Sequence, residues 1–253
     1  MSKNKYDVLP PDVQLPWKQS GPLPDDFDEG VLPSPQKGFM MAVCGGRNTG
    51  KSVVSYNLLK NFSGCYDGIH IFSPTWQQDP TIGPEATGIP ESNYHDTIDE
   101  EFILDLMKKQ DAEKKKFDKG IMKQKFLSRH LLVFDDCISC EGFNTQSLSG
   151  ILNKISFCGR HKRLSCLITT QAYKALPKKF RVNIPNWIFM KTYNEGERKA
   201  IAEEQSNTMS EKEFNSLFDK AIEDEYSFFY VFLDSPDKKT CFRKNLTNIL
   251  KIN

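Results

Sequence analysis

Residues 39–52 read FMMAVCGGRNTGKS, and this stretch decides the fold that the sequence predicts. Residues 39–44 are a continuous apolar run, which is typical of a parallel strand buried on both faces. Residues 45–52 match the pattern G-x-x-x-x-G-K-[ST] in full. Apolar side chains then recur at every fourth position between residues 54 and 62, as on one face of a helix. A glycine-rich loop between a buried strand and a helix predicts a phosphate-binding loop.

The residue types of this loop suit a triphosphate. Glycine lets the backbone turn so that several N–H groups converge on phosphate oxygens, and the amino end of the following helix adds its positive dipole end. We expect Lys51 to reach the β- and γ-phosphates of ATP and Ser52 to place its hydroxyl on Mg²⁺. The predicted ATP-binding residues are Gly45, Gly46, Arg47, Asn48, Thr49, Gly50, Lys51 and Ser52. The alternative, a glycine-rich turn that happens to carry Lys-Ser, does not explain the strand and helix around it.

Two aspartates follow an apolar strand predicted at residues 131–134. The end of that strand meets the nucleotide edge of a parallel sheet, so we expect Asp135 to hold Mg²⁺ through water. Asp136 stands where many ATPases carry a glutamate that polarises the attacking water. Aspartate is one methylene shorter, and capping of the next turn is the structural alternative for this pair.

Gln171 ends another predicted strand, at residues 165–170. A glutamine at a strand tip beside the γ-phosphate can orient water and report whether that phosphate is present. A strand that ends in glutamine distinguishes ATP-driven motors from nucleotide kinases. An exposed polar residue that only follows a strand is the alternative.

A basic turn at residues 159–163 precedes the Gln171 strand. Arginine beside a transferring γ-phosphate stabilises the developing negative charge. Arg160 is the first candidate for this role and Arg163 the second, each supplied by a neighbouring subunit, which would make hydrolysis depend on assembly. A turn that contacts DNA or is merely solvated is the alternative, because arginine and lysine also bind phosphate backbones.

The chain divides into three stretches. Residues 1–38 hold seven of the 14 prolines and predict an extended arm, either solvated or lying on a neighbour through Trp17, Phe27 and Leu32. Residues 39–191 alternate apolar strands with helical segments, which predicts a mainly parallel α/β sheet with helices on both faces.

The third stretch, residues 192–253, is a C-terminal extension that continues the core domain. It contains two polar helices and a further apolar strand at residues 227–233. Residues 239–244 are predicted to pair with that strand across a Ser-Pro-Asp turn.

The composition and net charge of the chain exclude several functional classes of protein. The chain has 253 residues, of which 38% are hydrophobic and 26% charged, as in globular domains. The net charge of only +1 argues against a free-standing DNA-coating protein. No apolar run is long enough for a membrane span, and the start lacks the apolar segment of a secretory signal, so we expect an intracellular protein. The seven cysteines include one CxxC pair, Cys137 and Cys140, which lacks the second pair that a structural zinc site needs.

Two basic clusters are candidates for contacts with DNA phosphates. Residues 108–125, inside a helix predicted over residues 99–126, carry eight lysines against three acidic residues, a local charge of +5. The second cluster follows the Gln171 strand and consists of Lys174, Lys178, Lys179 and Arg181. A solvated helix face is the alternative for the first cluster.

Four motifs follow one another along the chain: residues 45–52, the pair Asp135-Asp136, the turn at residues 159–161, and Gln171. In this order they resemble the motifs of the genome-packaging ATPases of large double-stranded DNA viruses and virophages, which belong to the FtsK/HerA-type superfamily. The resemblance covers residues 39–191. It implies a P-loop NTPase fold of the RecA/ASCE-like type, in which the P-loop strand lies beside the strand ending at Gln171. Asp136 in place of glutamate departs from the wider superfamily and leaves the identity of the base open.

The resemblance also implies an activity and partners. It implies an ATP hydrolase that uses ATP and Mg²⁺ to move double-stranded DNA into a preformed capsid. The implied partners are double-stranded DNA, proteins of the capsid or portal vertex, and identical subunits in a pentameric or hexameric ring. The implied location is the viral factory of the host cell or the virion. Two alternatives remain, an ATP-dependent switch or assembly factor and a nucleoside-type kinase, and the Asp-Asp and Gln171 endings argue against the kinase.

Overall fold

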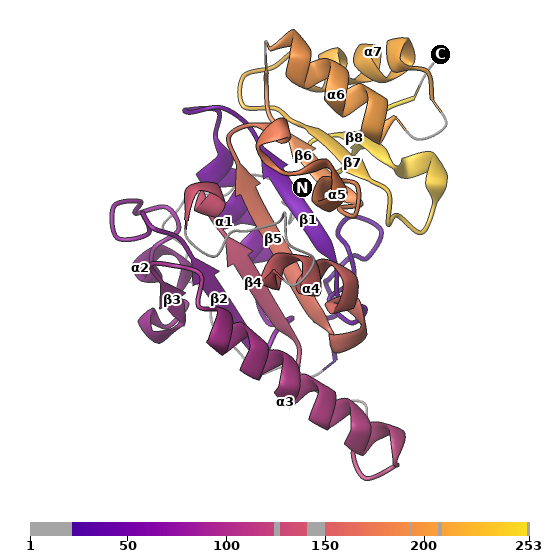
Figure 1. The fold of residues 1–253 in the computed structure, drawn as a ribbon. Helices are drawn as coiled ribbons and strands as arrows, with labels where there is room; N and C mark the ends of the chain where they lie inside the picture. Colours follow the sequence, from indigo (N-terminus) through magenta and orange to yellow (C-terminus); the bar gives the residue numbers. More distant parts are fainter. Residues whose placement is uncertain (1–21, 124–126, 141–149, 193, 207–208, 252–253) are drawn as a thin grey trace.

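The computed structural model describes residues 22–123, 127–140, 150–192, 194–206 and 209–251. In this part of the chain nine strands form one sheet, in the order β3-β2-β4-β5-β1-β6-β7-β8-β9 (Figure 1). The strands from β3 to β6 in this order pair in parallel, and β7, β8 and β9 add an antiparallel edge. The strands are β1 Met40–Cys44, β2 Gly68–Phe72, β3 Tyr94–His95, β4 His130–Phe134, β5 Leu164–Thr170, β6 Asn186–Phe189, β7 Phe229–Phe232, β8 Phe242–Lys244 and β9 Asn248–Ile249.

Strand β1 lies inside the parallel part, between β5 and β6, and all of its residues are buried. Its side chains alternate between two hydrophobic cores, with Met40, Ala42 and Cys44 in one and Met41 and Val43 in the other. Burial on both faces explains why the sequence is apolar without a break. Strand β5 lies between β1 and β4, so the predicted adjacency of the P-loop strand and the Gln171 strand is confirmed.

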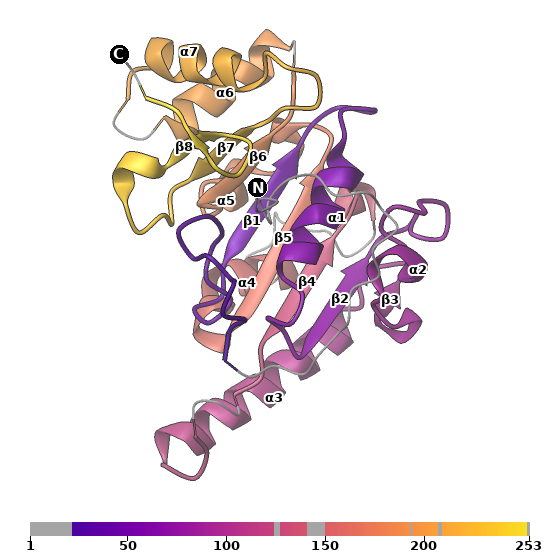
Figure 2. The same ribbon diagram turned by 180° about the vertical axis from the view of Figure 1, so that it is seen from behind.

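Helices cover both faces of the sheet, as the two opposite views show (Figures 1 and 2). Helix α1 packs on one face, and helices α3, α4, α5, α6 and α7 contribute to the core on the other. The predicted fold class, a mainly parallel α/β sheet between helices, is therefore confirmed. The helices are α1 Lys51–Asn61, α2 Pro84–Thr87, α3 Glu100–Asp118, α4 Ile151–Cys158, α5 Lys178–Arg181, α6 Glu195–Gln205 and α7 Glu211–Ala221.

The antiparallel edge follows the predicted strand pairing. Val231 of β7 lies opposite Phe242 of β8. Helix α7 packs on this edge, and its start is fixed by Ser210, whose side chain accepts a hydrogen bond from the backbone N–H of Glu213 while the Glu213 carboxylate accepts from the Ser210 backbone. The C-terminal strands thus extend the same sheet that carries the P-loop.

Residues 22–38 pack against their own chain. Leu32 is fully buried in the core beneath α1, and the ring of Phe27 lies 6.0 Å from that of Phe62. From β8, the Arg243 guanidinium donates to the carbonyl oxygen of Gly30 (2.6 Å). The expectation that this part is solvated or lies on a neighbour is wrong, because its apolar side chains complete the chain's own core. Trp17 lies outside the described residues.

Helix α3 is shorter than the helix predicted over residues 99–126. It begins after Asp99, whose side chain accepts from the backbone N–H of Phe102 (2.9 Å), and it ends at Asp118. Its first half packs on the sheet through Ile103 and Leu106, and its last turns project beyond the sheet (Figures 1 and 2). None of the described helices combines the length and the apolar character needed to cross a membrane.

Three histidines from adjacent strands lie together beneath α3. The ring of His70 on β2 lies 5.6 Å from that of His130 on β4 and 6.2 Å from that of His95 on β3, and Phe102 covers it at 4.7 Å. Within the described residues, neither ring nitrogen of His70 has a hydrogen-bond partner. Burial, and after it the charges of His130 and His95, lowers the pKa of His70 to about 3. Burial also lowers the pKa values of His95 and His130. The cluster is therefore neutral at neutral pH.

We expect the free energy of unfolding to fall as the pH drops below about 6.5. The unfolded chain binds protons there, whereas folded His70 resists protonation until about pH 3, so its contribution is complete above pH 6.5 and is lost across that window. The loss is at most about 1.4 kcal/mol per pH unit for each histidine. Urea unfolding between pH 7 and pH 5 should show a shallower pH dependence for His70→Phe. His161→Ala, at an exposed histidine, should leave the dependence unchanged, and an equal slope in both variants would contradict the prediction.

Candidate functional site

The phosphate-binding loop joins β1 to α1 at the carboxyl edge of the parallel strands. Gly50 precedes α1 with a φ of 94°, and Asn48 has a φ of 58°, a left-handed conformation that asparagine tolerates better than most residues. A Cβ atom on Gly45 would lie 2.5 Å from the Cβ atom of Met190, so only glycine fits where the loop leaves the sheet. The loop therefore reaches the amino end of α1, where backbone N–H groups bind phosphate.

Lys51 lies folded over this loop. Its Nζ donates to the carbonyl oxygen of Gly46 (2.9 Å), which also accepts from Thr49 Oγ1 (2.8 Å). Burial lowers the pKa of the Lys51 ammonium, and the charges of Asp136 and Asp135 oppose that shift. The negative charges of Asp135 and Asp136, the two carboxylates predicted to serve the nucleotide, therefore reach the Lys51 ammonium.

Asp135 directly follows β4 and is buried. Its carboxylate oxygens accept from Thr169 Oγ1 (2.7 Å) and from Ser73 Oγ (3.2 Å). Burial raises the pKa of this carboxyl, and the two hydroxyl donors oppose the shift. Both hydroxyl donors are neutral and do not balance the negative charge of the carboxylate. A hard divalent cation would supply that positive charge. The buried carboxylate of Asp135 is thus of the donor type that suits the predicted Mg²⁺, and Ser52, the other predicted ligand, lies in the first turn of α1.

Gln171 and Asp136 are in direct contact. Gln171 Nε2 donates to Asp136 Oδ2 (2.7 Å), and the Asp136 backbone N–H donates to Thr169 Oγ1 (3.0 Å). Neighbouring strands are about 4.8 Å apart, and β5 separates β1 from β4, so Gln171 emerges between the P-loop and Asp135. A hydrogen bond therefore joins Gln171 and Asp136, the two side chains predicted to orient water. This bond lies between the P-loop and Asp135, the predicted metal ligand.

A cavity of about 780 Å³ opens at this edge, and its wall includes Gln171 and the P-loop. Its wall also includes residues that were not predicted from the sequence, among them Glu197 on α6 and Tyr226 in the segment between α7 and β7. The Glu197 carboxylate accepts from the backbone N–H groups of Tyr173 (2.5 Å) and Lys174 (3.2 Å) and so fixes the segment that follows Gln171. Neither residue belongs to a motif, and no pattern in the sequence distinguishes them.

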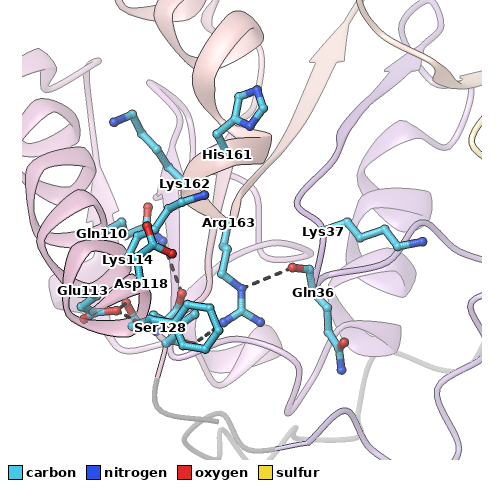
Figure 3. A pocket seen from close by; sticks show the side chains of 12 residues that line it. Gln36, Lys37, Gln110, Glu113, Lys114, Asp118, Ser128, His161, Lys162 and Arg163 are labelled. Atoms are coloured by element: carbon cyan, nitrogen blue, oxygen red, sulfur yellow. Dashed lines mark hydrogen bonds between the residues drawn. The ribbon is translucent and has the colours of Figure 1, made fainter. Parts of the chain in front are cut away.

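Arg160 and Arg163 lie at the opposite edge of the sheet from Gln171. Both precede β5, whose seven residues span about 23 Å at roughly 3.3 Å each. The Arg163 guanidinium donates to the carbonyl oxygens of Leu127 (3.0 Å) and Gln36 (3.3 Å) beside a separate cavity of about 270 Å³ (Figure 3). A role for either arginine at a γ-phosphate therefore requires the site of another subunit.

The two basic clusters differ in how far their charged side chains are exposed to solvent. Arg181 is buried and makes two bonds to the Glu204 carboxylate, both 2.7 Å, so its prediction as a DNA contact is wrong. Its charge is held by a carboxylate inside the fold. The remaining lysines of that cluster and the described lysines on the projecting part of α3 are exposed: Lys174, Lys178, Lys179, Lys108, Lys109, Lys114, Lys115 and Lys116.

The CxxC pair lies in the 3-10 turn after β4. Cys137 is buried, its Sγ donates to the carbonyl oxygen of Phe72 (2.9 Å), and burial raises the pKa of its thiol. Across the described part of the chain, no three His, Cys, Asp or Glu side chains gather closely enough to hold a metal ion. Cys137 therefore packs as a protonated thiol.

Comparison with known proteins places this geometry in a family. The family described as Poxvirus A32 protein matches residues 27–219. No curated protein sequence gives a significant match to the chain. The family match spans the P-loop, both aspartates, the basic turn and Gln171.

Solved structures share the fold at low sequence identity. The genome packaging NTPase B204 from Sulfolobus turreted icosahedral virus 2, in complex with AMPPCP, has a TM-score of 0.57 at 15% identity, over 85% of this chain and 100% of that one. The pCW3 conjugation coupling protein TcpA with ATPγS has a TM-score of 0.56 at 17% identity, over 96% and 71%. The cytoplasmic domain of the type VII secretion ATPase EccC from Thermomonospora curvata has a TM-score of 0.54 at 12% identity, over 86% and 24%. The family match and this fold confirm the resemblance to packaging ATPases stated from the motifs.

Proposed function

We propose that this chain, which belongs to the Poxvirus A32 protein family, is the ATP-driven motor that moves double-stranded DNA into a preformed viral capsid. Family and fold identify an ATP hydrolase of the genome-packaging type. The contact between Gln171 and Asp136 carries the proposal, because it joins a γ-phosphate sensor to a water-orienting carboxylate. A motor needs that junction, since it must convert the loss of a phosphate into movement. The motor would work inside the infected cell, at the viral factory.

Each residue of the site has a defined task in this proposal. When bound, ATP and Mg²⁺ supply the phosphoryl group and the charge that stabilises the leaving oxygens. Lys51 would hold the β- and γ-phosphates, and Ser52 and Asp135 would hold the metal. Asp136 orients the attacking water and accepts its proton, while Gln171 fixes the Asp136 carboxylate.

The position of Arg160 supports a ring of identical subunits. It precedes β5, at the edge away from its own P-loop. In a ring, one repeated contact brings that edge of each subunit to the nucleotide edge of the next. Arg160 would then stabilise charge on the γ-phosphate of the neighbour. Arg163 is the weaker candidate, because two carbonyl oxygens of its own chain already hold it.

The exposed Lys174, Lys178 and Lys179 are the proposed contacts to DNA. They follow Gln171 along the chain, and the Glu197 carboxylate holds the start of their segment. Contacts to phosphates carry no sequence information, which suits a motor that must pass any sequence. The capsid or portal vertex is the proposed partner at the destination.

Steady-state ATP hydrolysis with and without long double-stranded DNA, over a range of protein concentrations, tests the function. We expect DNA to raise kcat about 10-fold or more and the rate per subunit to rise cooperatively with protein concentration, because each site needs a neighbour's arginine. Higher salt should remove the stimulation, because phosphate contacts weaken steeply with ionic strength. Hydrolysis that ignores both DNA and protein concentration would favour a switch protein or a kinase.

A further inference from the structure

A second cavity, of about 810 Å³, lies on the far side of the P-loop from Gln171. It runs between the first turns of α1 and the segments on either side of β7 and β8, and its wall includes Gly50, Val53 and Asn57. Its lining is mainly apolar, and Val53 exposes 43% of its surface although it stands beside the phosphate-binding turn. No motif of the sequence accounts for an apolar groove at this place.

Tyr226 joins this cavity to the one beside Gln171, because it lines both. A Cβ atom on Gly50 would lie 3.4 Å from Tyr226 Cδ1, so the ring lies against the last glycine of the P-loop. Tyr226 is 64% exposed and has a φ of 59°, a left-handed conformation that is costly for a residue with a large side chain. An exposed aromatic ring held against the P-loop by a strained backbone points to a ligand rather than to packing.

The direction of a bound triphosphate follows from α1. The N–H groups of the first helical turn, at Lys51, Ser52 and Val53, have no partner within the helix and are aimed at phosphates. Gln171 lies at one end of this phosphate row and receives the γ-phosphate. The α-phosphate, and the sugar and base attached to it, must then leave at the Val53 end, which opens into the 810 Å³ cavity.

The charges around this exit are compatible with a nucleotide. Glu223 and Asp224 lie in the same segment as Tyr226, and both carboxylates pair with Lys244 (2.7 and 2.6 Å). The charges of these two carboxylates are therefore partly neutralised, whereas Glu225, which also lines the cavity, adds a negative charge that the Mg²⁺ bound with the triphosphate would offset. The cavity runs from Gly50, at the phosphate-binding end, to a wall that includes Val53, Val54 and Leu58.

We propose that this cavity seats the base of the nucleotide and that Tyr226 is the ring on which the base stacks. This inference rests on the proposed function of the P-loop and adds to it the determinant that distinguishes a nucleoside triphosphate from a bare triphosphate. Every nucleobase offers a π-face, so stacking of this kind needs no hydrogen-bond code.

Competition binding on the full chain with Mg²⁺ tests the proposal, with ATP and inorganic tripolyphosphate as the two probes. We expect the unaltered protein to bind ATP about 10-fold more tightly than tripolyphosphate, and Tyr226→Ala to remove most of that difference by weakening ATP alone. Tyr226→Phe keeps the ring and should keep the preference. Phe157→Ala removes an aromatic side chain of similar exposure (56%) on α4 and should change neither affinity.

The outcomes distinguish a failure of the proposed base-binding site from a failure of the proposed phosphate-binding loop. Equal binding of the two probes by the unaltered protein, or equal weakening of both by Tyr226→Ala, would overturn the base seat and leave the P-loop intact. Binding of both probes that survives Lys51→Ala would instead remove the P-loop on which the seat depends. A far-ultraviolet circular dichroism spectrum identical to that of the unaltered protein shows that Tyr226→Ala has folded.

Discussion

Lys51→Ala is expected to abolish ATP turnover, with a fall in kcat of at least about 100-fold. The Lys51 ammonium lies over the loop, 2.9 Å from the Gly46 carbonyl oxygen, where a phosphate oxygen can replace that carbonyl as its partner. Burial lowers its pKa, so its charge acts in a poorly solvated place where it counts for more than at the surface. Steady-state phosphate release measures the loss. Lys199→Ala, at a lysine whose side chain is 72% exposed, is the matched control and should keep full activity.

Mixed subunits extend this test to the assembly. Arg160→Ala alone should also be inactive, because every site in such a ring lacks the neighbour's arginine. Random mixing of Arg160→Ala with Lys51→Ala subunits should restore about a quarter of the activity, since one interface in about four then combines an intact P-loop with an intact arginine. The absence of any rescue would reject Arg160 as the residue supplied in trans.

Asp135→Asn has the second largest expected effect, a loss of about 100-fold or more in Mg²⁺-dependent turnover. Asparagine keeps an oxygen that can accept from Thr169 Oγ1, so the fold should be retained while the charge proposed to hold the metal is lost. Burial raises the pKa of this carboxyl, which means that the folded state disfavours its charge. The metal-free variant should therefore unfold at the same temperature as the unaltered protein or at a higher one.

Two measurements separate this role from a structural one. Titration with Mg²⁺ should no longer tighten ATP binding in Asp135→Asn, and thermal unfolding with EDTA should show no loss of stability. Asp105→Asn, at an exposed carboxylate on α3, should alter neither. Unchanged Mg²⁺ dependence in Asp135→Asn would exclude this carboxylate from the metal site.

The arrangement of the central site could be predicted because each of its residues follows a strand. Buried parallel strands are recognisable as apolar runs, and their carboxyl ends meet at one edge. The contact of Gln171 with Asp136 follows from that rule once β5 is placed beside β4. The strand order itself came from the resemblance rather than from the pattern of apolar residues.

The remaining features depend on contacts between distant parts of the chain. Arg181 stands in a basic run, yet Glu204 on α6 binds it inside the fold, and no local pattern records that partner. Tyr226 gains its place only when the turn before β7 meets the P-loop. Leu32 stands in a proline-rich stretch typical of a solvated arm, but Leu32 is buried in the core, Phe27 packs against it, and Arg243 binds the carbonyl oxygen of Gly30.

The seven residues of β5 would connect two nucleotide sites of the proposed ring. Gln171, the proposed sensor of a subunit's own phosphate, follows one end of this strand, and the turn with Arg160, the arginine proposed to serve the next subunit, precedes the other end. Close-packed interiors transmit strain, so a shift at the Gln171 end of β5 would reach the turn that carries Arg160. A single strand would then link the γ-phosphate sensor of one site to the arginine that serves the next site.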